Sequence, residues 1–379
     1  MPNPAANGTP DAAANATSEY RPGLKFSGSD RFVRELRRRV DAYFEQTGRK
    51  RRDCPAMYFK TFTILTWFFG AYALLLFVVS SWWLVLPLAV ILGVAMAAIG
   101  FNIQHDGGHK AYSDHQWINK IMALTLDLMG GSSYLWDWKH NSIHHTYPNV
   151  DGHDDDINIG IFGRLSPQQK RYWFHRLQGI YLWALYGLLA IKWHFFDDFH
   201  NIAVGRIGQN KIRRPRGMDL AVFIGGKVIF FSMAFVIPML LHPWWAVLGV
   251  YAIAAFISGV VLSVVFQLAH CVTEAEFPVP VPTETGGERM STDWAVHQVL
   301  TTVNFSRQNR FLCWFLGGLN FQVEHHLFHR VCHIHYPALS KVVKQTCDEF
   351  GLRYAEHRSI FTAIASHFRW LVQMGRPTV

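Results

Sequence analysis

The sequence lacks the features of an iron–sulfur protein and of a secreted protein. Its five cysteines form no CxxC pair, so we expect free thiols in a reducing compartment and no iron–sulfur cluster. Residues 1–28 are rich in Ala, Asn, Pro, Gly and Ser and contain no apolar stretch that could serve as a signal peptide. We therefore predict that they form a disordered N-terminal tail.

The apolar residues occur in long runs. Half of the 379 residues are hydrophobic and 15% are aromatic. A chain of this length could form two soluble domains, but blocked apolar runs favour a membrane protein. The formal net charge of +9 is compatible with nucleic-acid binding. However, the cations cluster beside the apolar runs, and this arrangement fits the positive-inside rule better.

Four runs have about the length that a bilayer requires: residues 58–79, 84–103, 220–241 and 246–268. The uncharged aromatic turns at 80–83 and 242–245 are predicted to face away from the cytoplasm. Both termini then lie in the cytoplasm. Lys227 interrupts the third run and must reach the interface or face protein. The predicted fold is an all-α membrane protein with four transmembrane helices and a cytoplasmic helical cap that carries a histidine-rich di-metal site.

The remaining segments are assigned around these spans. Residues 29–57 are predicted to form an amphipathic helix from a Ser29 cap to about Thr47, followed by a basic linker. Its apolar stripe either packs on the protein or lies on anionic headgroups as an interfacial helix. Two shorter apolar stretches, 118–129 and 181–191, are expected to lie in or against the interface. Residues 58–352 form the main domain, and residues 353–379 a C-terminal cytoplasmic segment.

Three histidine clusters lie beside the spans, at 104–109, 140–145 and 322–326. His105 and His109 are four residues apart and share one face of a helix, so both can bind one metal. Because a structural zinc ion usually takes four ligands, eight or nine candidates imply two metal ions. A haem iron takes two axial ligands and would leave most of them unexplained. The candidates are His105, His109, His140, His144, His145, His270, His325 and His326, with Gln322 as a possible oxygen ligand.

Two non-haem irons at a membrane surface point to oxygen activation, because an alkyl C–H bond offers no acidity to a general base. The motifs HDGGH, HNSIHH and QVEHH resemble those of the integral-membrane fatty acid desaturases. We call these three motifs the first, second and third histidine boxes. Gln322 stands in place of the first histidine of the third box, and in this the chain resembles the front-end (Δ5/Δ6-type) group. The resemblance implies O2-dependent introduction of a cis double bond by a di-iron centre. It also implies that the eight histidines are ligands and that Gln322 binds directly or through water.

Carboxylates beside the boxes are expected to hold the ligating imidazoles in place, and Asp106 and Asp155 are selected for this role. The HPGG haem motif of a fused cytochrome b5 domain does not occur in the sequence. We therefore expect a separate electron donor, either ferredoxin-like or cytochrome b5-like. Family members often have proline where this chain has His329. His329, His333 and His335 either lie on the surface or support the ligating residues, and we favour the surface for all three.

The expected substrate is an acyl chain carried by CoA, carrier protein or membrane lipid, with no nucleic-acid partner. In a prokaryote the enzyme would lie in the inner membrane, with the active site in the cytoplasm. A hydroxylase on the same metal centre is the nearest alternative. A metal transporter or haem-binding membrane protein is more distant, because transporters place polar residues in the middle of their spans.

Overall fold

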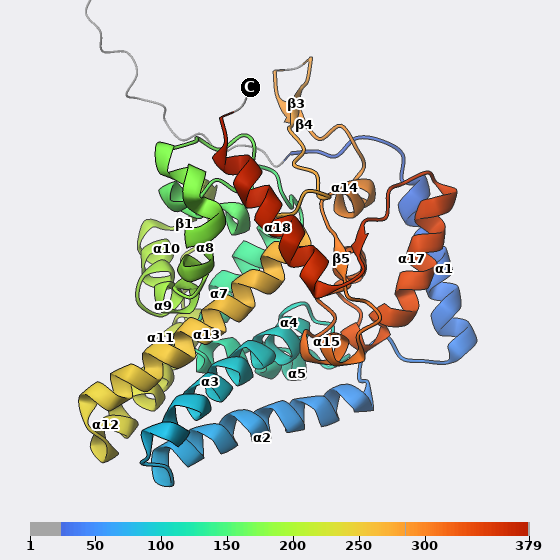
Figure 1. The fold of residues 1–379 in the computed structure, drawn as a ribbon. Coiled ribbons are helices and arrows are strands. Elements are labelled where there is room, and N and C mark those ends of the chain that lie inside the picture. The colour runs from blue at the N-terminus through green and yellow to red at the C-terminus, as the bar shows by residue number, and fades with distance from the viewer. Residues whose placement is uncertain (1–23, 285, 378–379) are drawn as a thin grey trace, which may run out of the picture.

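The computed structural model describes residues 24–284 and 286–377 (Figure 1). Over these residues the chain is mainly helical. Within the described residues the strands form three pairs, and each strand is two residues long. The first two pairs are antiparallel and the third is parallel. The pairs are β1 (Arg206–Ile207) with β2 (Asn210–Lys211), β3 (Val281–Pro282) with β4 (Glu288–Arg289), and β5 (Asn304–Phe305) with β6 (Glu356–His357).

Four helices are long and apolar enough to cross a membrane, as predicted. Each lies within a few residues of its predicted bounds. The third is interrupted by the π-helical segment η7, because Pro238 has no N–H to donate to the carbonyl four residues earlier. The four are α2 (Pro55–Phe77); α3 (Trp82–Ile99) with η1 (Gly100–Gln104) and α4 (His105–Gly108); α11 (Met218–Phe231) with η7 (Ser232–Val236) and α12 (Ile237–Leu241); and α13 (Trp244–His270).

The spans pack through small residues and expose large ones. A Cβ on Gly93 of α3 would collide with the backbone of Ala254 on α13, so glycine is needed for this close approach. On α2, in contrast, Phe59 and Phe62 are 73% and 68% exposed. Such apolar exposure over a whole helix face is typical of a surface that contacts lipid. Lys227 faces protein, where its Nζ lies 2.7 Å from a carboxylate oxygen of Asp198.

Helix α1 (Arg31–Thr47) packs on the protein and does not offer its apolar face to lipid. Phe32, Leu36, Val40 and Phe44 are buried, and Figure 1 shows α1 beside α17 (Tyr336–Glu349). Of the two alternatives for its apolar stripe, the structure therefore shows packing on the protein and not an interfacial helix, because the cap buries the stripe. The helix begins at Arg31 after Asp30, and not after Ser29.

The two ends of the chain contribute more to the fold than predicted. Residues 1–23 of the predicted tail lie outside the described residues, but Leu24 is buried and Ser27 donates its N–H to the Thr292 carbonyl at 3.0 Å. In the C-terminal segment, α18 (Ile360–Gly375) packs on α8 (Gln178–Tyr186) and α13. Trp370 donates its indole N–H to the Leu165 carbonyl at 2.9 Å.

The shorter helices form the cap and, as predicted, do not span. Between the second and third spans they are α5 (Gln116–Ala123), α6 (Thr125–Leu128), α7 (Ser133–Trp136), η2 (Asp137–His144), η3 (Asp155–Ile157), η4 (Gly160–Phe162), η5 (Trp173–Leu177), α8, α9 (Leu189–Lys192), η6 (Trp193–Asp197) and α10 (Asp198–Val204). After the fourth span they are α14 (Trp294–Leu300), α15 (Arg310–Phe315), α16 (Gln322–Phe328), η8 (His333–His335), α17 and α18.

Candidate metal centre

The first histidine box lies at the end of the second span. His105 and His109 flank one turn of α4, and their ring centroids are 4.5 Å apart. The two glycines between them are needed for close packing. A Cβ on Gly107 would lie 2.6 Å from the backbone nitrogen of Ala123 in α5, and a Cβ on Gly108 would overlap the Trp136 ring. Trp136 leads into the second box, so Gly108 lets the second box approach the first.

The second box lies on the π-helix η2. The His145 N–H donates to the His140 carbonyl at 3.0 Å, an i to i+5 bond that widens the turn. This widening turns His140, His144 and His145 toward one region, where a regular α-helix would spread positions i, i+4 and i+5 over a wider arc. The π-helix was not predicted from the sequence.

The third box lies on α16, and His270 is the last residue of α13. The Nε2 atoms of His325 and His145 are 3.1 Å apart, and the Gln322 side-chain nitrogen lies 2.9 Å from Nε2 of His270. All eight predicted imidazoles and Gln322 therefore lie in one region. Their ring nitrogens form three overlapping groups: His105, His109, His140 and His325; His144, His270 and His326; and His145, His325 and His326.

Three polar side chains contact box imidazoles at Nδ1. His144 Nδ1 lies 3.0 Å from a carboxylate oxygen of Asp154, and His140 Nδ1 lies 3.3 Å from Asp156. His326 Nδ1 donates to the side-chain oxygen of Gln298 on α14 at 2.8 Å. Each contact fixes the ring and leaves Nε2 for a metal.

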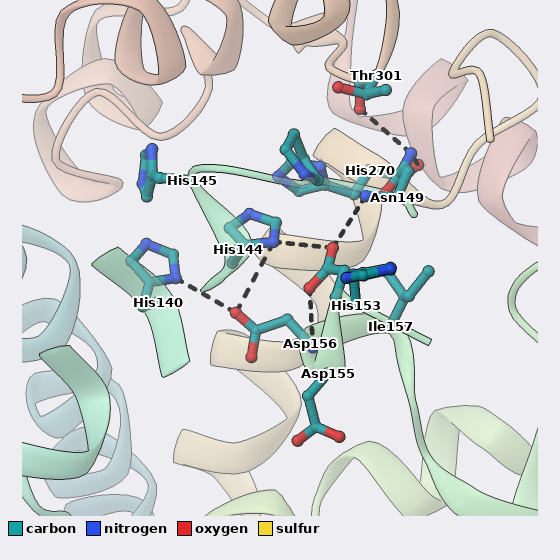
Figure 2. A network of polar contacts seen from close by, with 12 residues as sticks. His140, His144, His145, Asn149, His153, Asp155, Asp156, Ile157, His270 and Thr301 are labelled. Atoms are coloured by element: carbon teal, nitrogen blue, oxygen red, sulfur yellow. Dashed lines mark hydrogen bonds and ion pairs between the residues drawn. The ribbon is translucent and has the colours of Figure 1, made fainter. Parts of the chain in front are cut away.

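The two carboxylates selected from the sequence do not contact box imidazoles. Figure 2 shows the Asp155 carboxylate pointing away from the histidines, and it lies 3.4 Å from Lys139 Nζ. Its two sequence neighbours, Asp154 and Asp156, make the contacts with box imidazoles that were predicted for Asp155. The 3₁₀ turn η3 directs these two side chains inward. Asp106 accepts from His333 Nδ1 at 2.9 Å. It therefore ties the first box to the segment after the third.

The unpaired polar atoms at the centre fit a bound metal. Among the described residues, no hydrogen-bond partner is found for Nε2 of His140, His144 and His326, for either ring nitrogen of His109, or for Oε1 of Gln322. Leaving so many buried polar atoms unpaired is costly. Coordination of metal ions by these atoms would remove that cost, so the residues present fit the group that the boxes predict.

The protonation states also suit metal ligands, which must be neutral imidazoles. Burial, and after it the neighbouring imidazoles, lower the pKa of His109, His145, His325 and His326 well below the ordinary value. Burial acts on His144 in the same direction, but Asp154 and Asp156 together outweigh it and raise the pKa of that imidazole.

The surface prediction for His333 and His335 is wrong. Both are buried, and His335 Nε2 donates to the Lys50 carbonyl at 2.8 Å. His329 is partly buried, with its ring centroid 4.9 Å from that of His145. Several histidines outside the boxes are also buried, and backbone carbonyl groups accept from their ring nitrogens. Examples are His175, His297 and His367.

Comparison with known proteins identifies the family. A family model described as fatty acid desaturase matches residues 80–358. The chain belongs to the fatty acid desaturase family. It is 38% identical to the sn-1 linoleoyl-lipid 6-desaturase of Synechocystis sp., over 93% of this chain and 98% of that protein. It is 38% identical to the protein of the same name from Arthrospira platensis, over 93% and 95%, and 36% identical to an acyl-lipid (8-3)-desaturase of Physcomitrium patens, over 96% and 75%.

These findings confirm the predicted family and its front-end resemblance. This protein is an oxidoreductase of lipid metabolism, and its four long apolar helices make it a multi-pass membrane protein. The family and the histidine groups together imply that it uses a metal.

Proposed function

We propose that this desaturase uses O2 and two non-haem irons to introduce a cis double bond into the acyl chain of a membrane lipid. Two hydrogens would leave adjacent methylenes, and O2 would be reduced to water with two electrons from an external donor protein and two protons. The observation that supports this most is the set of unpaired Nε2 atoms at the meeting point of the three boxes. Imidazole ligation of this kind suits iron.

An acyl lipid is the proposed substrate, as the names of the relatives suggest. A cavity of about 320 Å³ lies between the spans, and its walls are almost wholly apolar. Residues from all four spans contribute to it, including Phe68, Leu92, Phe230 and Ala254. Met129, in the segment between α6 and α7, also lines it. An alkyl tail in this cavity would stay out of water.

The chain would hold and orient the metal ions through its own side chains. His105, His109, His140 and His325 would hold one ion, and His144, His270, His326 and Gln322 the other, with His145 beside both groups through His325 and His326. When bound, the irons would supply the oxidising power that breaks an unactivated C–H bond. Asp154, Asp156 and Gln298 would keep Nδ1 of three imidazoles engaged so that Nε2 faces the centre. Burial of the boxes would exclude water from it.

The boxes and both termini are proposed to face the cytoplasm, in a bacterial inner membrane if the source is prokaryotic. The support is the charge around the spans. Arg49, Lys50 and Arg51 precede the first span and are exposed, whereas the turns at 80–83 and 242–245 carry no Lys or Arg.

The experiment is expression in a host that lacks the activity, with lipid-linked acyl chains analysed by mass spectrometry. We expect a product two hydrogens lighter than the substrate, two irons per chain and no haem absorbance. His144→Ala should abolish the product, and His115→Ala, at an exposed histidine, should leave it unchanged. A product heavier by one oxygen would show a hydroxylase. No product despite full iron loading and a working donor would rule out both activities.

A further inference from the structure

Two cysteine side chains meet where α2 begins beside η8. Cys54 is the residue before α2, and Cys332 is the residue before η8. Both side chains are buried and pack with Met57 and Tyr112. The Cys332 thiol donates a hydrogen bond to the Cys54 sulfur, and the Cys332 backbone N–H donates to the Arg51 carbonyl at 3.0 Å. Two segments far apart in the sequence therefore form one thiol pair.

His335 makes the Cys54 sulfur a hydrogen-bond acceptor. Its Nε2 lies 2.8 Å from the Lys50 carbonyl oxygen and 3.2 Å from Cys54 Sγ. Because a carbonyl can only accept, Nε2 carries the hydrogen and presents it to both atoms. Cys54 thus accepts from the imidazole and from the Cys332 thiol, and it also stands at the N-terminal end of a 23-residue helix. All three features favour a thiolate at this position.

The two thiols differ in acidity. The hydrogen bond from Cys332, and then His335, lower the pKa of the Cys54 thiol and outweigh burial, which acts in the opposite direction. The hydrogen bond to Cys54, and then burial, raise the pKa of the Cys332 thiol well above its ordinary value. The pair therefore consists of one nucleophilic thiolate and one protonated partner. This division is typical of thiols that form disulfides reversibly.

The groups next to Cys332 do not favour a metal ion there. Asp106 and His333 are close enough to Cys332 to share one ion. However, His333 Nδ1 donates to Asp106 at 2.9 Å, and His333 Nε2 accepts from Lys60 Nζ at 2.9 Å. A metal ion would have to displace one of these two partners. Thiol chemistry requires no such displacement.

Both cysteines adjoin side chains that hold the first histidine box. His333 follows Cys332 and contacts Asp106, which lies within that box. Asp53 precedes Cys54 and accepts a backbone N–H at 2.9 Å from the segment after the box. A disulfide holds its sulfurs about 2 Å apart, closer than any hydrogen bond allows. Closing the pair would therefore move the supports of the first box.

We propose that Cys54 and Cys332 are a peroxide-sensitive thiol pair, which closes to a disulfide and lowers activity by displacing the first histidine box. The Cys54 thiolate attacks one oxygen of hydrogen peroxide, the O–O bond breaks, and the departing hydroxide takes up a proton. The Cys332 sulfur then attacks the resulting sulfenic acid, the S–O bond breaks, and hydroxide leaves with the thiol proton as water. Two thiols are oxidised, and one peroxide is reduced to two waters.

The thiol chemistry is independent of the proposed desaturase function, and only its effect on turnover rests on that function. In a reducing compartment such a disulfide would be transient, as redox-sensing disulfides are. Thiol mapping and activity therefore test the two parts of the inference separately.

The first test treats the purified full-length protein in nanodiscs with hydrogen peroxide and then blocks free thiols with a maleimide. We expect three free thiols where the untreated protein has five, and a cross-linked peptide that contains Cys54 and Cys332. Cys313 is the internal control, because it is more exposed than either partner and should stay free. Five free thiols after treatment, or oxidation spread over all the cysteines, would overturn the inference.

The second test separates the switch from direct damage to the metal centre. Peroxide should remove most of the desaturation by the unaltered protein, and dithiothreitol should restore it. Cys54→Ser and Cys332→Ser should each form no cross-link and keep their activity, whereas Cys313→Ser should stay as sensitive as the unaltered protein. Equal losses in all four proteins that dithiothreitol does not reverse would overturn the switch. Absence of turnover before treatment would contradict the proposed function and leave the thiol mapping valid.

Discussion

Asp154 is the residue through which the second box is most firmly held. Its carboxylate accepts from His144 Nδ1 and from the backbone N–H of Asn149 and Asp156. We expect Asp154→Asn to lower metal affinity about 10- to 100-fold, the usual effect of losing such a partner. Metal titration followed by elemental analysis measures this. Asp155→Asn is the matched control, because Asp155 contacts Lys139 and no imidazole. Equal losses in both variants would contradict the assignment.

The contrast between Asp154 and Asp155 shows what the residue pattern could predict at this scale. The box spacing predicted that His105 and His109 share one face of a helix, and the structure brings these two imidazoles together with the other six. It could not select among three consecutive aspartates, because the fold of the η3 turn decides which side chains point inward. Gln298 carries no motif at all. It reaches His326 only because α14 packs on α16, a contact between segments 28 positions apart.

At the scale of elements, the close approach of α4 and Trp136 fixes the first two boxes relative to each other. Gly108→Ala would place a methyl group inside the Trp136 ring and force it to move. Overpacking of this kind costs about 1–3 kcal/mol, and here it would also displace His140, on which Trp136 stacks. We expect a lower melting temperature and lower iron content. Gly70→Ala is the control, because nothing lies within 4 Å of a Cβ at Gly70 on α2.

Helix α18 is held by a histidine that must stay neutral. His367 Nδ1 donates to the Cys271 carbonyl at 2.7 Å, and its Nε2 accepts from the Tyr186 hydroxyl at 2.8 Å. Burial lowers the pKa of His367 to about 4, below the unfolded value of about 6.5. The folded state therefore binds fewer protons than the unfolded state, and stability is lost as the pH falls from 6.5 toward 4.

His367 alone should contribute about 2 kcal/mol to the loss of stability at pH 5 relative to pH 7.5. Melting curves in detergent at the two pH values measure it. His367→Gln should be less stable at pH 7.5 but should show a smaller difference between the two pH values. His115→Gln, at an exposed position, should keep the full difference. An unchanged difference in the His367 variant would mean that another group titrates.

The elements also differ in how far the sequence could predict them. The spans are properties of composition over about twenty residues, so their positions follow from the apolar runs. The stripe on α1 predicted a helix but not its partner, because the same amphipathic pattern fits a lipid surface and the groove beside α17. No residue pattern predicted the π-helix η2, because its hydrogen bonds differ from those of an α-helix only by one residue in spacing.

For the whole molecule, the number of spans and the charges beside them support the proposed orientation in the membrane. An even number of spans would place both ends of the chain on one side, and the exposed cations before the first span favour the cytoplasm. All three boxes would then lie on the side where soluble reductants are available. Reporter fusions can test on which side of the membrane the C-terminus and the turn at 80–83 lie.

We expect a fluorescent protein fused to the C-terminus to fold and fluoresce, and alkaline phosphatase fused there to be inactive. Alkaline phosphatase inserted in the turn at 80–83 should be active, because this turn carries tryptophans and no cation and lies at the far end of α2. Changing Arg49, Lys50, Arg51 and Arg52 together to Gln should weaken the bias and yield a mixed population. Phosphatase activity at the C-terminus of the unaltered chain would reverse the topology and place the boxes on the side away from cytoplasmic electron donors.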